Sequence, residues 1–201
     1  MPPGHVAITW GMASLMQKNN EKLTGLDYRL LAFCALAPDI IDKPLALLVF
    51  TEAHTSQLIA HALLPHVLLL MAALLWWRPA LPYVLAFNGH LLADRMWNHT
   101  ESFWWPLFGW DAFWQFQFMN TPEAMVSVYW DIVTRYPQVW LVELLALWFL
   151  LLFGFRYGLY RRRRLAAFLR TGRVNEPLAA TPTTRPAGIG SATAPQHPPS
   201  E

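Results

Sequence analysis

Residues 139–157 read VWLVELLALWFLLLFGFRY, an apolar run interrupted only by Glu143 before it reaches Arg156. A helix that crosses the hydrocarbon core of a bilayer needs about 20 mostly apolar residues. A second run, 58–77, reads LIAHALLPHVLLLMAALLWW, and its only polar residues are His61 and His66. Both runs therefore predict membrane-spanning helices.

The composition agrees with a membrane protein. The chain has 201 residues, of which 55% are hydrophobic and 14% charged, and it contains 11 tryptophans. A soluble domain usually carries about a quarter charged residues. The length suits one domain, and the single cysteine, Cys34, excludes an internal disulfide.

Three weaker segments complete the predicted fold. The apolar run 30–50 is broken by APDIIDKP, 80–97 is apolar up to His90, and 5–16 is too short to cross fully. We therefore expect an all-α, multi-pass membrane bundle of about four or five apolar helices. We also expect residues 1–170 to form one membrane-embedded domain, and 171–201 to form a disordered cytoplasmic tail.

Residues 98–119 are dense in tryptophan and phenylalanine. Amphipathic rings favour the headgroup level of a membrane, which predicts an interfacial anchor. The alternative is a lid that guides an amphipathic substrate to a site.

Basic residues set the expected orientation. Seven of the fifteen Lys and Arg residues lie between positions 156 and 173. Because cytoplasmic ends of spanning helices are enriched in Lys and Arg, the end of the last helix and the tail are predicted to be cytoplasmic. The net charge of +2 does not indicate nucleic-acid binding.

This topology gathers scattered ionisable residues on one side of the membrane. Ionisable groups at membrane depth usually pair, line a wet cavity or bind something. The gathered residues are His5, Asp39, Asp42, His54, His90, Asp94 and His99.

Their spacing is compatible with a metal site. His90 and Asp94 are four residues apart and share one helix face, and Asp39 and Asp42 are three apart. Imidazole and carboxylate suit zinc, with manganese or iron as alternatives. The competing interpretation is a solvated acidic turn, with His61 and His66 as ordinary buried histidines; His61 could also support a ligand from behind.

Four motifs occur in a recognisable order: GHVAITWG, APDIID, EAHTSQLIAHALL and GHLLADRMWNHTESFWWPLFG. Over roughly residues 4–110 the chain resembles the YdjM-like family, LexA-binding, inner-membrane-associated proteins classed as metal-dependent hydrolases. That family is distantly similar to zinc-dependent phospholipase C and the P1-type nucleases. The resemblance implies a bacterial inner-membrane location, a LexA-like partner and phosphoester hydrolysis. It also implies a ligand set, namely His5, Asp39, His54, His90 and Asp94.

The sequence thus favours a membrane-bound hydrolase that cleaves a phosphoester, on a lipid-like or other amphipathic substrate, through a metal-activated water. Asp42 or His99 would assist proton transfer. One or two ions are expected, because a second helical H-x-x-x-E is missing. The rival is a non-catalytic scaffold or transporter subunit with a buried His/Asp network, and the two differ in whether the site opens to water.

Overall fold

The computed structural model describes residues 2–20, 23–50, 55–111 and 122–174. These residues form an all-helical protein, as predicted, with no strand among them. The elements are α1 (Pro2–Asn19), α2 (Tyr28–Leu48), η2 (Ile59–His61), α3 (Leu63–Leu75), η3 (Arg78–Ala80), α4 (Leu81–Ala93), η4 (Met96–Asn98), α5 (Thr100–Phe103), α6 (Pro122–Arg135), α7 (Pro137–Arg156) and α8 (Arg162–Thr171).

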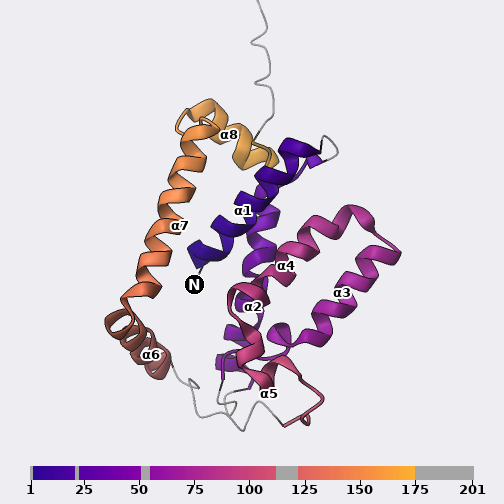
Figure 1. Cartoon of the computed structure of the whole chain (residues 1–201), viewed down its shortest axis with the longest axis vertical. Coiled ribbons are helices and arrows are strands. Elements are labelled where there is room, and N and C mark those ends of the chain that lie inside the picture. Colours follow the sequence, from indigo (N-terminus) through magenta and orange to yellow (C-terminus); the bar gives the residue numbers. More distant parts are fainter. Residues whose placement is uncertain (1, 21–22, 51–54, 112–121, 175–201) are drawn as a thin grey trace, which may run out of the picture.

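Three helices form the centre of the molecule. α2 packs on both α1 and α4, and α1 also packs on α4. α7 covers α1 on one flank and α3 covers α4 on the other, while α8 crosses the end of α7 (Figure 1). The tail from residue 175 onward and the aromatic residues 112–119 lie outside the described part of the chain.

The predicted bundle of four or five spanning helices is wrong. Among the described helices, α7 alone is long and apolar enough to cross a membrane. α3 and α4 have 13 residues each, about 20 Å of helix against a hydrocarbon core of about 30 Å. α2 has 21 residues, but Asp39, Asp42 and Lys43 interrupt its apolar character.

The physical reason for this error lies in the ends of the apolar runs. Residues 59–61 form η2 and 78–80 form η3, so the run 58–77 is a short helix with a turn at each end. The run 139–157, by contrast, forms α7 almost in full. Only 11% of the apolar stretch of α7 is buried within the protein.

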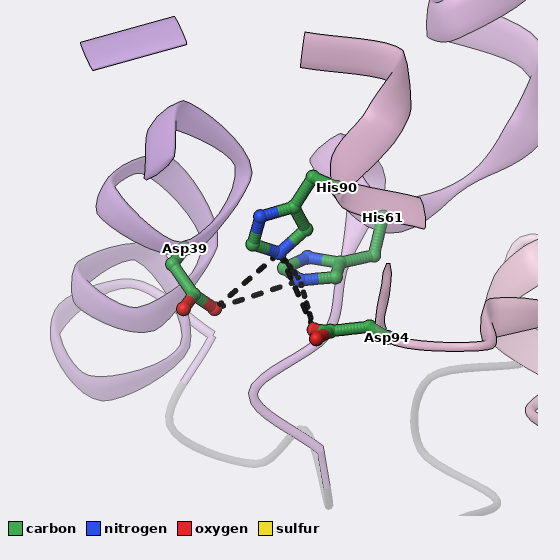
Figure 2. A group of neighbouring side chains, drawn as sticks. All are labelled: Asp39, His61, His90 and Asp94. Atoms are coloured by element: carbon green, nitrogen blue, oxygen red, sulfur yellow. Dashed lines mark hydrogen bonds and ion pairs between the residues drawn. The ribbon is translucent and has the colours of Figure 1, made fainter. Parts of the chain in front are cut away.

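α2 continues through the segment that was expected to break it. Pro38 and Pro44 both lie inside the helix, although each removes one backbone hydrogen bond. Asp27 caps its start by accepting hydrogen bonds from the amides of Arg29 (2.9 Å) and Leu30 (3.2 Å). Because the helix is continuous, Asp39 projects from its side toward η2 and α4 (Figure 2).

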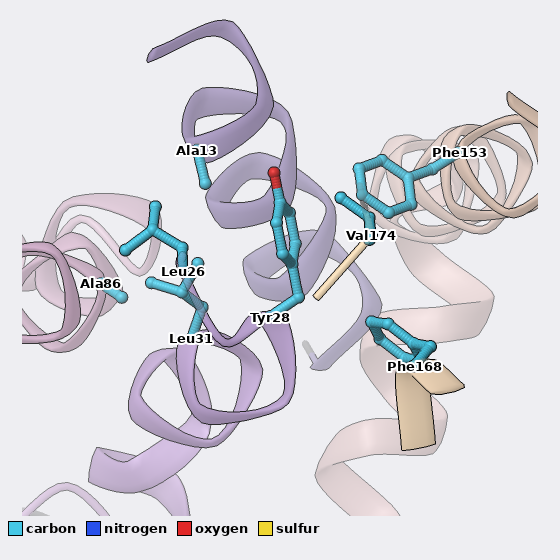
Figure 3. Packing of buried hydrophobic residues seen from close by; sticks show 8 residues of the cluster. All are labelled: Ala13, Leu26, Tyr28, Leu31, Ala86, Phe153, Phe168 and Val174. Atoms are coloured by element: carbon cyan, nitrogen blue, oxygen red, sulfur yellow. The ribbon is translucent and has the colours of Figure 1, made fainter. Parts of the chain in front are cut away.

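A buried aromatic cluster holds α1, α2, α7 and α8 together. Tyr28, Phe153 and Phe168 form its centre, with smaller residues around them (Figure 3). The Trp10 indole contacts all three rings and donates a hydrogen bond to the Tyr28 carbonyl oxygen (2.8 Å). α8, which the sequence did not predict as a helix, thus docks through Phe168.

Candidate metal centre

Two carboxylates and two imidazoles from three elements converge in the middle of the molecule. Asp39 comes from α2, His61 from η2, His90 from α4, and Asp94 is the residue that ends α4. One potential ligand atom from each lies within 4.8 Å of all the others (Figure 2). This buried group could therefore hold a metal ion.

The spacing of His90 and Asp94 has the expected consequence. The two side chains lie on one face of α4, with Nε2 of His90 3.3 Å from Oδ2 of Asp94. Asp39 approaches from α2, its Oδ1 3.6 Å from Nε2 of His61 and 3.9 Å from Nε2 of His90. The two carboxylates thus reach the same pair of nitrogens from different helices.

Asp42 builds the loop that carries His61. Its two oxygens accept hydrogen bonds from the backbone amides of Leu58 (2.8 Å), Ala60 (3.0 Å) and His61 (3.0 Å). Oδ2 also bonds Nδ1 of the His61 ring at 2.7 Å. The Asp42 side chain is fully buried, so its carboxylate fastens η2 to α2 and aims the His61 ring.

The hydrogen bonds assign the tautomers of both central histidines. Nδ1 of His61 faces the Asp42 carboxylate, and Nδ1 of His90 lies 2.8 Å from the carbonyl oxygen of Ala35. Both partners act as acceptors here, so each Nδ1 carries the proton and each Nε2 keeps a lone pair when the ring is neutral. Such a bond behind a histidine is the usual support of a metal ligand.

The two Nε2 atoms face each other at 3.2 Å. Two lone pairs repel at this distance unless a proton or a metal ion lies between them. A tetrahedral zinc ion with bonds of about 2.0–2.1 Å separates two nitrogens by about 3.3 Å. The donor set, two imidazoles and two carboxylates, is also one that zinc, manganese or iron accepts.

The electrostatics of the group also favour a positive charge at its centre. Burial lowers the pKa of His61, but hydrogen bonds to Asp39 and Asp42 outweigh it and raise the pKa to about 8. Burial raises the pKa of Asp94, yet hydrogen bonds from His5 and His90 more than compensate and hold it well below its usual range. For Asp39, bonds from His61 and Lys43 likewise overcome burial and lower the pKa. The carboxylates are therefore ionised at neutral pH.

Solvent reaches this group from the carboxylate side. The His61 and His90 side chains are completely buried, whereas those of Asp39 and Asp94 are 14% and 21% exposed. A closed polar network would bury all four. The two imidazoles are therefore enclosed, and the two carboxylate side chains are partly accessible to solvent.

His5 lies beside the group, on the outer side of Asp94. Its Nε2 is 3.1 Å from Oδ1 of Asp94, and its ring stacks on His90 with centroids 4.2 Å apart. These contacts leave Oδ2 of Asp94 directed at the histidines of the centre. Direct ligation by His5 stays a prediction, and its contacts fit a residue that positions Asp94.

The remaining predicted residues differ in their placement. His54 lies outside the described residues. His99 is exposed between η4 and α5, and no contact of its ring with the four central residues occurs in the described structure. A catalytic role for Asp42 or His99 stays untested, although the four bonds to Asp42 favour a positioning role.

His61 is the one member of the group that the sequence assigned to a supporting role. Because His61 lies within the apolar run 58–77, which was expected to be one long helix, it was interpreted as a buried core histidine. Pro65 could have indicated where the helix begins. Proline favours the first turn of a helix, and here it is the third residue of α3. That placement leaves His61 ahead of the helix, in η2.

Comparisons with protein-family models, with curated proteins and with solved structures find no match to this chain. The case for a metal centre therefore depends on the geometry of these residues. The resemblance drawn from the four sequence motifs remains a hypothesis, and it enters the functional argument as such.

Proposed function

We propose that this chain is a metal-dependent hydrolase whose metal ligands are Asp39, His61, His90 and Asp94. The observation that carries the proposal is the pair of Nε2 atoms 3.2 Å apart, each fixed from behind and flanked by a carboxylate. With both rings neutral this arrangement presents two lone pairs to one point, which suits a divalent cation.

A bound divalent ion, zinc or alternatively manganese or iron, supplies a low-pKa water and a Lewis acid. The chain's own residues hold the ligands in place for it. Lys43 bonds the outer oxygen of Asp39 at 2.8 Å, and His5 bonds the outer oxygen of Asp94, so each carboxylate presents its other oxygen to the centre. The exposed rim of Asp39 and Asp94 is the side from which a substrate can approach.

A phosphoester is the proposed substrate class, and its support is the motif resemblance. Large apolar side chains near this end of the molecule add support for an amphipathic substrate. Trp104, Leu107, Phe108 and Trp110 are all exposed in the turns that follow α5, and α5 contacts η2. Several exposed large apolar side chains in one short segment are typical of a surface that binds an apolar partner.

We also propose that α7 attaches the protein to a membrane. Its outward residues are exposed, Leu145 and Leu151 among them, and it ends at Arg156. The basic residues that follow predict a cytoplasmic position for this end. A LexA-like partner, which the resemblance implies, would then meet the protein on that side.

The alternative function is a non-catalytic scaffold in which the His/Asp group is a purely structural network. The hydrogen bond available between His61 and His90, if one of them is protonated, favours this alternative. The partial exposure of Asp39 and Asp94 favours the hydrolase, because a structural network gains nothing from an accessible rim.

The deciding experiment measures bound metal in the full chain purified in neutral detergent. We expect near-stoichiometric metal in the parent and its loss in Asp94→Asn and His61→Gln. Asp131→Asn is the matched control, since Asp131 is an exposed carboxylate far from the centre, and it should retain the metal. Parent protein stripped with a chelator should gain thermal stability when zinc is added back.

Activity is then tested on the metal-loaded protein with bis(p-nitrophenyl) phosphate and a short-chain phospholipid. Hydrolysis that disappears in Asp94→Asn supports the hydrolase. Folded protein that binds neither zinc nor manganese contradicts the proposed metal centre. Metal-loaded protein that hydrolyses neither substrate class favours the scaffold.

A further inference from the structure

The chain turns sharply between α7 and α8. Gly158 has a φ of +68°, a conformation that side-chain-bearing residues rarely adopt, and its carbonyl accepts a hydrogen bond from the Arg161 amide (3.0 Å). The Leu159 amide bonds the Gly154 carbonyl at 2.8 Å, which closes the end of α7. The start of α8 is thereby brought back beside the end of α7.

This turn creates an open hollow of about 490 Å³. Three arginines line it, Arg156 from the end of α7 and Arg161 and Arg164 from the start of α8. Tyr157, Tyr160 and Val174 also line it. The hollow is therefore strongly cationic, and most of its accessible lining is polar.

The positive charge of the hollow is not neutralised by the rest of the described structure. No carboxylate among the described residues lies within ion-pair distance of Arg156, Arg161 or Arg164. The Arg156 guanidinium lies 5.9 Å from the centroid of the Tyr157 ring, and Arg161 lies 5.5 Å from that of Tyr160. Cation–π contacts of this kind orient a guanidinium without using its N–H donors.

Guanidinium donors that no carboxylate of the described residues occupies are suited to a phosphate ester, whose oxygens accept bidentate hydrogen bonds. The neighbouring helix indicates the source of that phosphate. α7 is apolar and mostly exposed up to Phe155, which also lines the hollow, so a bilayer around α7 would place its headgroups at Arg156.

We propose that this hollow binds the phosphate headgroup of an anionic phospholipid. The proposal rests on the membrane attachment of α7 and is independent of the metal chemistry. α1 separates the two sites: His5 near its start contacts Asp94, whereas Ser14 bonds the Tyr157 hydroxyl at 2.6 Å. Nine residues of helix correspond to about 13 Å.

The test measures lipid binding to the full chain in neutral detergent, with dioctanoylphosphatidylglycerol as the anionic probe. Dioctanoylphosphatidylcholine and inorganic phosphate are the comparison ligands, and native mass spectrometry reports binding. We expect phosphatidylglycerol to bind at least tenfold more tightly than either. Dioctanoylphosphatidylcholine tests whether binding requires a net negative charge, and inorganic phosphate tests whether binding requires the lipid.

Two double variants locate the binding. Arg161→Gln/Arg164→Gln removes two residues that line the hollow, whereas Arg162→Gln/Arg163→Gln removes the same charge from the same helix outside it. Each arginine near an anionic headgroup contributes about a fivefold effect on affinity, so the first variant should lose about 30-fold. The second should stay within about threefold of the parent, since only screened long-range attraction is lost.

Three outcomes would overturn the proposal: no binding of phosphatidylglycerol to the parent, equal losses in the two variants, or inorganic phosphate binding as tightly as the lipid. Circular dichroism of each variant verifies that α8 is still folded. Metal content, measured on the same samples, should not change. A failure of lipid binding is thereby separated from a failure of the metal centre.

Discussion

The two ends of α1 face opposite kinds of environment. Near its start, His5 joins a group in which every central side chain has a specific polar partner. From its middle onward, Trp10 packs into aromatic rings and Ser14 bonds Tyr157, and the arginines beyond them lie at the surface without a carboxylate partner among the described residues. The difference follows from burial: a buried charge must be paired, while water can satisfy an exposed one.

The largest expected loss of stability comes from a substitution in the polar group near the start of α1. Asp42→Ala leaves three backbone amides and Nδ1 of His61 without their acceptor. We expect a loss of about 3–5 kcal/mol in the free energy of unfolding, together with loss of bound metal. Thermal and urea unfolding measure the first effect and metal analysis the second.

The matched control for that substitution is Asp131→Ala. Asp131 forms an exposed pair with Arg135, so its removal should change stability by no more than about 0.5 kcal/mol. If the two substitutions have equal effects, the Asp42 carboxylate does not hold the loop as described.

A slightly smaller loss of stability is expected from a substitution in the buried aromatic cluster. Phe168→Ala removes a buried ring that contacts Trp10, and it should cost about 3 kcal/mol through the cavity it leaves. Metal content should remain that of the parent, because the centre lies at the other end of α1. Leu169→Ala, at the neighbouring exposed position, should be close to neutral. Metal loss in the Phe168 variant would show that the two ends are coupled.

The smallest effect concerns pH and the cap of α2. Hydrogen bonds from Arg29 lower the pKa of Asp27 in the folded protein, against a smaller opposing effect of burial. The ionised carboxylate therefore stabilises the fold above its unfolded pKa of about 3.9, and this contribution disappears as the pH falls through the folded pKa.

Thermal unfolding between pH 2 and 6 checks this expectation with Asp27→Asn. The difference in melting temperature between parent and variant should be constant above about pH 5 and shrink as the pH falls. A difference that persists at the lowest pH would mean that the charge of Asp27 has no part in the cap.

The sequence anticipated several local features for a clear reason. Helical content and the extent of α7 follow from apolar runs, and the approach of His90 to Asp94 follows from a spacing of four residues. These properties depend on near neighbours in one element. The number of spanning helices could not be obtained in this way, because a count of apolar residues does not register turns such as η2 and η3.

The composition of the centre shows where sequence reasoning reached its limit. Asp39, His90 and Asp94 were expected together on the basis of a membrane topology that proved wrong, and packing of α2 against α4 is what joins them. The choice of His61 could not be foreseen, since it depends on four hydrogen bonds to one carboxylate 19 residues earlier in the chain.

By itself, then, the sequence determined that the described fold is all-helical, where the long apolar helix α7 lies, and which residues share a helix face. The tertiary structure alone decided that His61 faces His90 and that three arginines surround one hollow. The physical reason is that helix formation depends on neighbours a few residues apart. Contacts between separate elements depend on loops and on the pairing of buried polar groups.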